Sequence, residues 1–117
     1  MMNNINFIIR VTNENENADI ISIYLIDDDG YSFYAEFNDY NIFKCSNYIK
    51  NSIVNNLRFN NLNDYINEND PYTIIYKDCK ENLSLKLNNW LKTFKNISFV
   101  GNKETYGWYH FLKLISK

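Results

Sequence analysis

The pattern of apolar and polar positions predicts a central hairpin over Ala18–Phe37. Residues Ile20–Ile26 are almost all β-branched or aliphatic, which is typical of a strand buried on both faces. Three aspartates and Gly30 follow, and these residue types favour a tight turn. Over Tyr31–Phe37 apolar residues alternate with Ser, Tyr and Glu, a pattern that predicts a strand with one covered face.

Three more strands and three helices are expected outside the hairpin. The strands are predicted at Asn6–Val11, Tyr72–Tyr76 and Ile97–Gly101, with Tyr72–Tyr76 at a sheet edge. The first helix is predicted at Lys44–Leu57 and the last at Glu104–Ser116. The middle helix is predicted to begin at a capping box formed by Asp78 and Glu81 and to end at about Phe94. Their apolar stripes are Ile49, Ile53, Val54 and Leu57; Leu83, Leu87, Trp90, Leu91 and Phe94; and Trp108, Phe111, Leu112 and Ile115. The Asn- and Asp-rich segment Arg58–Pro71 is the least ordered-looking part of the chain.

This order of elements predicts one α/β domain over residues 1–117 with a mixed sheet. Three strands form an antiparallel meander, and the later strands must cross over through helices to lie parallel to a neighbour. Such an order is characteristic of the ribonuclease H-like architecture, although other α/β folds also fit it.

Composition narrows the functional classes. With 14 acidic and 12 basic residues the net charge is −2, which argues against a general polyanion binder. No apolar run approaches the roughly 20 residues of a membrane span, and the N-terminus lacks signal-peptide features, so we expect a cytoplasmic protein without membrane contact. The two cysteines lack metal-binding spacing and are expected to be free thiols. Abundant Asn, Ile, Lys and Tyr, with few Gly and Pro, indicate an AT-rich genome.

Three stretches resemble the small DEDDh-type 3′-5′ exoribonucleases of bacteria and phages. They are IIRVTNENENADIISIYLIDDDGYSFYAEFNDYN, LNNWLKTF and ISFVGNKETYGWYHFLKLI, and together they cover most of the chain. The family opens with a strand ending in Asp-Thr-Glu-Phe, followed by DLISIG-like and GREFYAEF-like strands. The resemblance implies a ribonuclease H-like fold that is incomplete at the C-terminal side, because the family's last helix would lie beyond Lys117.

The resemblance also implies that the catalytic carboxylates are missing. Such enzymes hold two divalent cations between carboxylates, and Mg²⁺ requires hard oxygen ligands. On this sequence the first motif places its Asp at Arg10 and its Glu at Thr12. The second motif places its Asp at Asn102, and the Tyr-Asp-Trp helix reads Tyr106-Gly107-Trp108. We therefore expect no metal, no cofactor and no catalytic residue.

Several other residues near the vacated site are candidates for binding. Tyr106 and Tyr109 have rings that stack on bases in single-strand binders, although helix packing is the simpler explanation for aromatics in this segment. Arg10, Asn13 and His110 complete the expected binding set. The run Asp27–Asp29 is expected to be a solvated turn and not a cation site, because adjacent residues in a tight turn cannot converge on one ion.

The sequence thus predicts a catalytically inactive exonuclease-like domain with a binding or regulatory role. The expected partner is an unidentified protein, and a small degenerate domain of this composition suggests a phage or mobile-element inhibitor of a host enzyme or defence nuclease, of the anti-CRISPR type. Nucleic acid is the weaker partner hypothesis, and a homodimer is compatible with the sequence. The alternatives are an active metal-dependent exoribonuclease with its carboxylates elsewhere, a non-catalytic RNA- or nucleotide-binding module, and a structural subunit.

Overall fold

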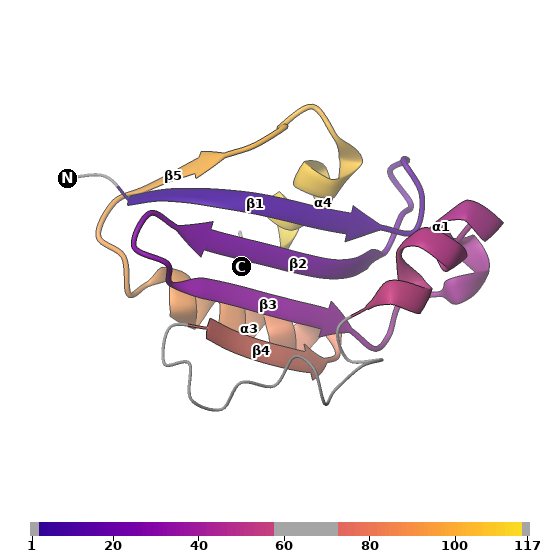
Figure 1. Cartoon of the computed structure of the whole chain (residues 1–117), viewed down its shortest axis with the longest axis horizontal. Coiled ribbons are helices and arrows are strands. Elements are labelled where there is room, and N and C mark those ends of the chain that lie inside the picture. Colours follow the sequence, from indigo (N-terminus) through magenta and orange to yellow (C-terminus); the bar gives the residue numbers. More distant parts are fainter. Residues whose placement is uncertain (1–2, 58–72, 116–117) are drawn as a thin grey trace.

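The chain folds around a mixed sheet whose strand order is β4-β3-β2-β1-β5 (Figure 1). This computed structural model describes residues 3–57 and 73–115, so the prediction for Arg58–Pro71 lies outside the described residues. The strands are β1 (Asn3–Val11), β2 (Ile20–Asp27), β3 (Ser32–Phe37), β4 (Thr73–Asp78) and β5 (Ile97–Val100). β1, β2 and β3 form the predicted antiparallel meander, whereas β4 lies parallel to β3 and β5 parallel to β1.

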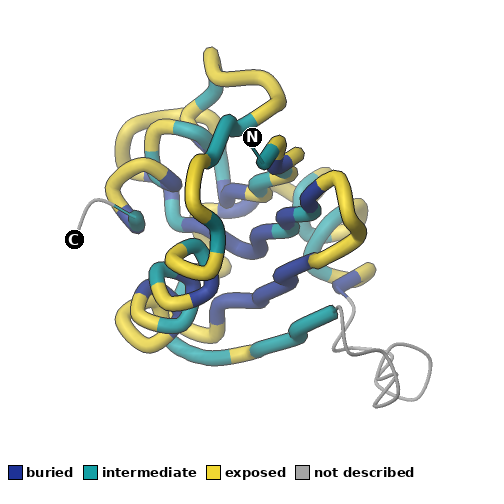
Figure 2. Tube along the Cα trace, turned by 90° about the vertical axis from the view of Figure 1, so that its left-hand side faces the viewer, coloured by how far each residue is buried: buried dark blue, intermediate teal, exposed yellow. Residues whose placement is uncertain are grey.

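Two helices cover one face of the sheet. α3 (Lys80–Leu91) and α4 (Tyr106–Ile115) both lie behind the strands in Figure 1. Their buried side chains join those of the strands in one apolar core, and Figure 2 shows the buried residues concentrated in the central strands. The core residues contributed by the two helices are Leu83, Leu87, Trp90, Phe111 and Leu114.

The opposite face of the sheet is partly covered by three short helical pieces. They are η1 (Ile42–Lys44), α1 (Asn47–Ser52) and η2 (Val54–Asn56), so the single helix predicted at Lys44–Leu57 is wrong. Side chains break the helix locally: Asn41 accepts the Phe43 N–H and Ser46 accepts the Ile49 N–H, and each cap starts a new turn. The predicted apolar stripe is nevertheless used, because its residues pack with Ile21 and Cys45 in a second cluster.

Strand β3 is buried on both faces, so the prediction of one exposed face is wrong. All six residues of β3 are buried, including Ser32, Tyr34 and Glu36. The Tyr34 hydroxyl donates to Glu36 Oε2 (2.6 Å), and Ser32 is 3.1 Å from the Thr73 hydroxyl of β4. These hydrogen bonds satisfy polar atoms at a depth where unpaired ones would be costly.

Two details of the helices also differ from expectation. In α4, Leu112 is 42% exposed while Gly107 and Leu114 are buried, so the buried stripe is rotated relative to the prediction. The capping box is wrong as well, because the N-cap of α3 is Cys79 and makes no side-chain cap. The Lys80 N–H instead donates to Asp39 Oδ2 (3.0 Å), a partner far away in the sequence.

Asp78 stabilises the start of α3 from outside the helix, which makes its contribution depend on pH. Hydrogen bonds from the Cys79 N–H (2.7 Å) and then from the Asn82 amide (3.1 Å) lower the pKa of Asp78. A depressed pKa means that the stabilisation is present above the unfolded-state pKa of about 3.9 and is lost as the pH falls through the lower folded-state pKa. We expect Asp78→Asn to be less stable than the wild type near neutral pH, with the difference shrinking below about pH 4. Urea denaturation across this pH range measures it, and a difference that persists in acid would contradict this assignment.

Candidate functional site

The candidate site lies at the C-terminal end of β1, where the loop of residues 12–19 meets both layers. Glu14 Oε2 accepts the backbone N–H of Tyr106 at the start of α4 (3.2 Å). His110 Nε2 donates to the carbonyl oxygen of Asn15 (3.1 Å). These two contacts join segments more than ninety residues apart in the sequence.

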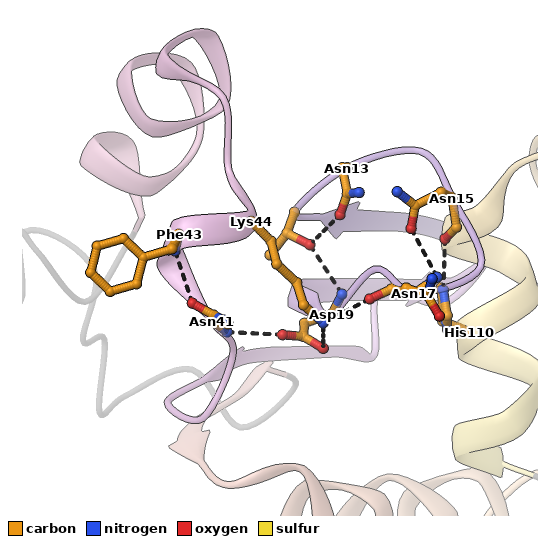
Figure 3. A network of polar contacts seen from close by, with 9 residues as sticks. Asn13, Asn15, Asn17, Asp19, Asn41, Phe43, Lys44 and His110 are labelled. Carbon is orange, nitrogen blue, oxygen red and sulfur yellow. Dashed lines mark hydrogen bonds and ion pairs between the residues drawn. The ribbon is translucent and has the colours of Figure 1, made fainter.

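Asp19 ties the same loop to η1 on the other side (Figure 3). One carboxylate oxygen accepts the Asn41 N–H (2.9 Å), and the other forms an ion pair with Lys44 Nζ (3.1 Å). Lys44 also donates to the carbonyl of Asn17 (2.7 Å). The network holds η1 in place although most of it is accessible to solvent.

The Asp19 network is expected to contribute modestly to stability. Asp19→Ala removes the ion pair and an acceptor of the Asn41 N–H, and because both charged side chains are 34% exposed, water compensates in part. We expect a loss of about 1 kcal/mol in the free energy of unfolding, measured by urea denaturation. Asp28→Ala in the exposed hairpin turn is the control and should change stability by less than about 0.5 kcal/mol. Equal losses in the two variants would contradict a specific role for Asp19.

The predicted site residues do not all face one another. Register and burial place Asn6, Ile8 and Arg10 on the sheet face opposite α3 and α4. Gly107 belongs to α4 and contacts Ile9 from the helix-covered face. Tyr106, Tyr109 and His110 are also on α4, so the structure separates Arg10 from the aromatic members of the predicted binding set.

At the four positions where the family has catalytic carboxylates, this chain has residues that are not carboxylates. Thr12 is fully buried, donates to Asn13 Oδ1 (2.7 Å) and accepts the Asp19 N–H (3.0 Å). Asn102 accepts the Glu104 N–H (3.0 Å) in the turn before α4. At Gly107 an added Cβ would lie 3.2 Å from both the Ile9 Cβ and the Ile9 carbonyl oxygen. With Arg10 as the fourth position, this donor set does not fit two divalent cations, which require hard oxygen ligands.

The aromatic residues of α4 form a small exposed group. Tyr106 and Tyr109 are each 41% exposed, and their rings meet edge to face with centroids 5.9 Å apart. Lys113 Nζ lies over the Tyr109 ring, 4.3 Å from its centroid, and the His110 ring centroid lies 5.0 Å from that of Tyr109. Trp108 by contrast packs against Phe7, Phe99 and Phe111 and is committed to the core.

A groove of about 1050 Å³ lies on the other face of the sheet, and no pattern along the chain had predicted it. The strand register sets its floor as adjacent rows, one with Ile8, Tyr24 and Tyr34 and the next with Arg10 and Ser22. α1 and η2 form its wall, which includes Tyr48, Ile49, Ile53 and Leu57. Only the pairing of β1, β2 and β3 brings the floor residues together, which is why spacing along the chain did not predict them.

Cys45 is buried at the back of this layer, which disfavours its thiolate form. Burial raises the pKa of the Cys45 thiol, so it packs in the second cluster as a small apolar side chain. Both Cys45 and Cys79 are free thiols, as predicted. Among residues 3–57 and 73–115, no three His, Cys, Asp or Glu side chains gather as a metal site.

The fold and site define a compact α/β domain with a five-stranded mixed sheet and an open groove on one face. In comparisons with known proteins, no protein-family model matches this chain, and no curated protein matches it at a significant level. No helix in the described part of the chain has the length and apolar character needed to cross a membrane.

Proposed function

We propose that this protein is a catalytically inactive, ribonuclease H-like relative of the DEDDh exoribonucleases that acts by binding a protein. The parallel pairing of β5 with β1 supports the resemblance, because it sets the two motif-bearing strands side by side. The occupied carboxylate positions support the loss of catalysis. The inhibitor role toward a host enzyme or defence nuclease is supported by sequence character alone.

The position of Gly107 supports moving the alignment of the first motif by one residue. Setting Asp-Thr-Glu-Phe on Val11, Thr12, Asn13 and Glu14 matches the threonine. It also places the motif's Asp at Val11, two residues after Ile9 on the face that Gly107 contacts. In the first alignment the two carboxylate positions of this motif hold arginine and threonine, and in the second they hold valine and asparagine. Neither alignment supplies a carboxylate, so the proposed loss of catalysis holds for both.

One observation carries the binding role: two aromatic side chains project from a segment that is held in place. Phe43 is 88% exposed and Tyr48 is 76% exposed. Exposed aromatic residues on an ordered surface are typical of energetically important positions in protein interfaces. A net charge of −2 further favours a protein partner over a nucleic acid.

Two assays test this proposal. Calorimetric titration with Mg²⁺ and Mn²⁺, with a single-stranded RNA degradation assay alongside, should show neither metal binding nor degradation beyond that seen with a chelator. Metal-dependent degradation would contradict the loss of catalysis.

In pull-downs from source cells, a partner retained by the wild type and by Leu85→Ala but lost with Phe43→Ala would support the binding surface. Retention that is identical for all three would contradict it. Leu85 is a matched control because it is 65% exposed on α3.

A further inference from the structure

Phe43 and Tyr48 are the two most exposed aromatic side chains among the large apolar residues of the described chain. Figure 3 shows the Phe43 ring pointing away from the Asp19 network, and the side chain is exposed. Neither residue belongs to either apolar cluster. These two rings therefore do not stabilise the isolated fold, and exposed apolar side chains that gather beside a groove are typical of an interaction site.

The backbone at both positions is fixed before any partner arrives. The Phe43 N–H donates to Asn41 Oδ1 (3.0 Å), and Asn41 is in turn held by Asp19. Tyr48 lies in the first turn of α1, which Ser46 caps. Ordering these segments on binding therefore costs little conformational entropy, which favours affinity.

The exposed rings of Phe43 and Tyr48 lie at the same end of the molecule as the groove. Tyr48 itself lines the groove, and Phe43 directly precedes the lining residue Lys44. The groove presents Ile8, which is 51% exposed, and the half-buried Tyr24. It also presents Arg10, which makes no hydrogen bond or ion pair with any described residue that would restrain its guanidinium.

We propose that the partner of this surface is a second copy of the chain, in a twofold dimer in which Phe43 of each copy enters the groove of the other. A twofold interface requires a self-complementary surface, and a projecting ring beside a groove that accepts a ring meets this condition. The Arg10 guanidinium stacks on the incoming Phe43 ring, a cation–π contact that strengthens when water is excluded. This inference rests on the binding role proposed above but not on the loss of catalysis.

The area available is compatible with such a dimer. A buried aromatic side chain contributes about 150–250 Å², so two from each copy supply roughly 600–1,000 Å². The exposed groove residues Ile8 and Arg10 of each copy add to this area, toward the roughly 1,200–2,000 Å² that a specific interface buries.

Sedimentation velocity of the full chain over a wide concentration series tests the proposal. The wild type should change from monomer to dimer as its concentration rises. Phe43→Ala should raise the dissociation constant by about 30-fold or more, as expected for a central aromatic residue, and Arg10→Ala should also raise it. Leu85→Ala, which removes an equally accessible side chain from α3, should leave it unchanged. A wild type that stays monomeric at every concentration, or equal effects of Phe43→Ala and Leu85→Ala, would overturn the proposal.

Disulfide trapping tests the geometry independently. A Phe43→Cys copy mixed with an Ile8→Cys copy should form a heterodimer under mild oxidation, because the ring position of one lies in the groove of the other. Phe43→Cys mixed with Leu85→Cys should give only the background set by Cys45 and Cys79. Efficient trapping in the second mixture, or none above background in the first, would contradict the twofold arrangement. Neither experiment depends on the nuclease assay, so the two proposals can fail separately.

Discussion

Phe33→Ala is expected to lower the free energy of unfolding by about 3–5 kcal/mol. Phe33 lies in β3 at the centre of the core and is fully buried. Its ring centroid is 5.6 Å from that of Trp90 on α3 and 5.7 Å from that of Tyr76 on β4. Truncation therefore leaves a cavity where three elements meet, in a domain whose total stability is expected to be about 5–15 kcal/mol.

Urea denaturation followed by tryptophan fluorescence and circular dichroism measures this loss. Coincident transitions with the two probes are needed for a two-state free energy. Leu85→Ala is again the matched control, because it truncates an apolar residue on the solvent side of α3 and should change stability by less than about 0.5 kcal/mol. A loss below about 1 kcal/mol for Phe33→Ala would contradict the placement of this ring between helix and sheet.

The strands could be predicted from the sequence because their signal is local. The apolar run of β2 and the Asp-Asp-Gly turn both lie within a few residues, and the structure confirms the hairpin, with Gly30 at φ +89° in its turn. The burial of β3 could not be predicted in the same way. Tyr34 and Glu36 have the polarity of an exposed face, yet both are buried, and no local sequence pattern reports that burial.

For Lys44–Leu57 the sequence correctly predicted which residues share an apolar face, but wrongly predicted that they lie on one continuous helix. Apolar spacing identified Ile49, Ile53 and Leu57 as residues that pack together, and they do so against Ile21. The competing signal came from Asn41 and Ser46, whose side chains bond to nearby backbone N–H groups and favour short turns over a continuous helix. Periodicity reports which residues share a face but does not report these caps.

The candidate site was the least predictable part because its contacts are long-range. The bond between Asp19 and Asn41 spans 22 residues, that between Asp39 and Lys80 spans 41, and that between Glu14 and Tyr106 spans 92. No spacing rule covers such distances. The family resemblance did select positions at the end of β1, but only the strand register shows that Arg10 and Gly107 lie on opposite faces.

Gly107→Asp, which would place a carboxylate where the proposed resemblance to the exoribonucleases expects one, should lower the free energy of unfolding by about 2–4 kcal/mol. The new Cβ would lie 3.2 Å from the Ile9 carbonyl oxygen, which is part of β1 and cannot rotate away. The carboxylate would also start from a buried position beside that oxygen, where desolvation and repulsion add to the steric cost.

Gly107→Ala separates the steric part from the electrostatic part. Glycine to alanine at an exposed helix position stabilises by up to about 1 kcal/mol, so a net loss here would itself report the close contact with β1. Truncating Ile9 should not relieve the loss, because the two closest atoms are its Cβ and its backbone oxygen. Urea denaturation of both variants measures these effects, and a Gly107→Ala variant more stable than the wild type would contradict the contact.

Gly107→Asp should also gain no metal-dependent nuclease activity, because Arg10, Thr12 and Asn102 would still supply no carboxylate. The tight packing of α4 on β1 thus makes a carboxylate at position 107 costly in stability, and that carboxylate alone would not complete a two-metal site.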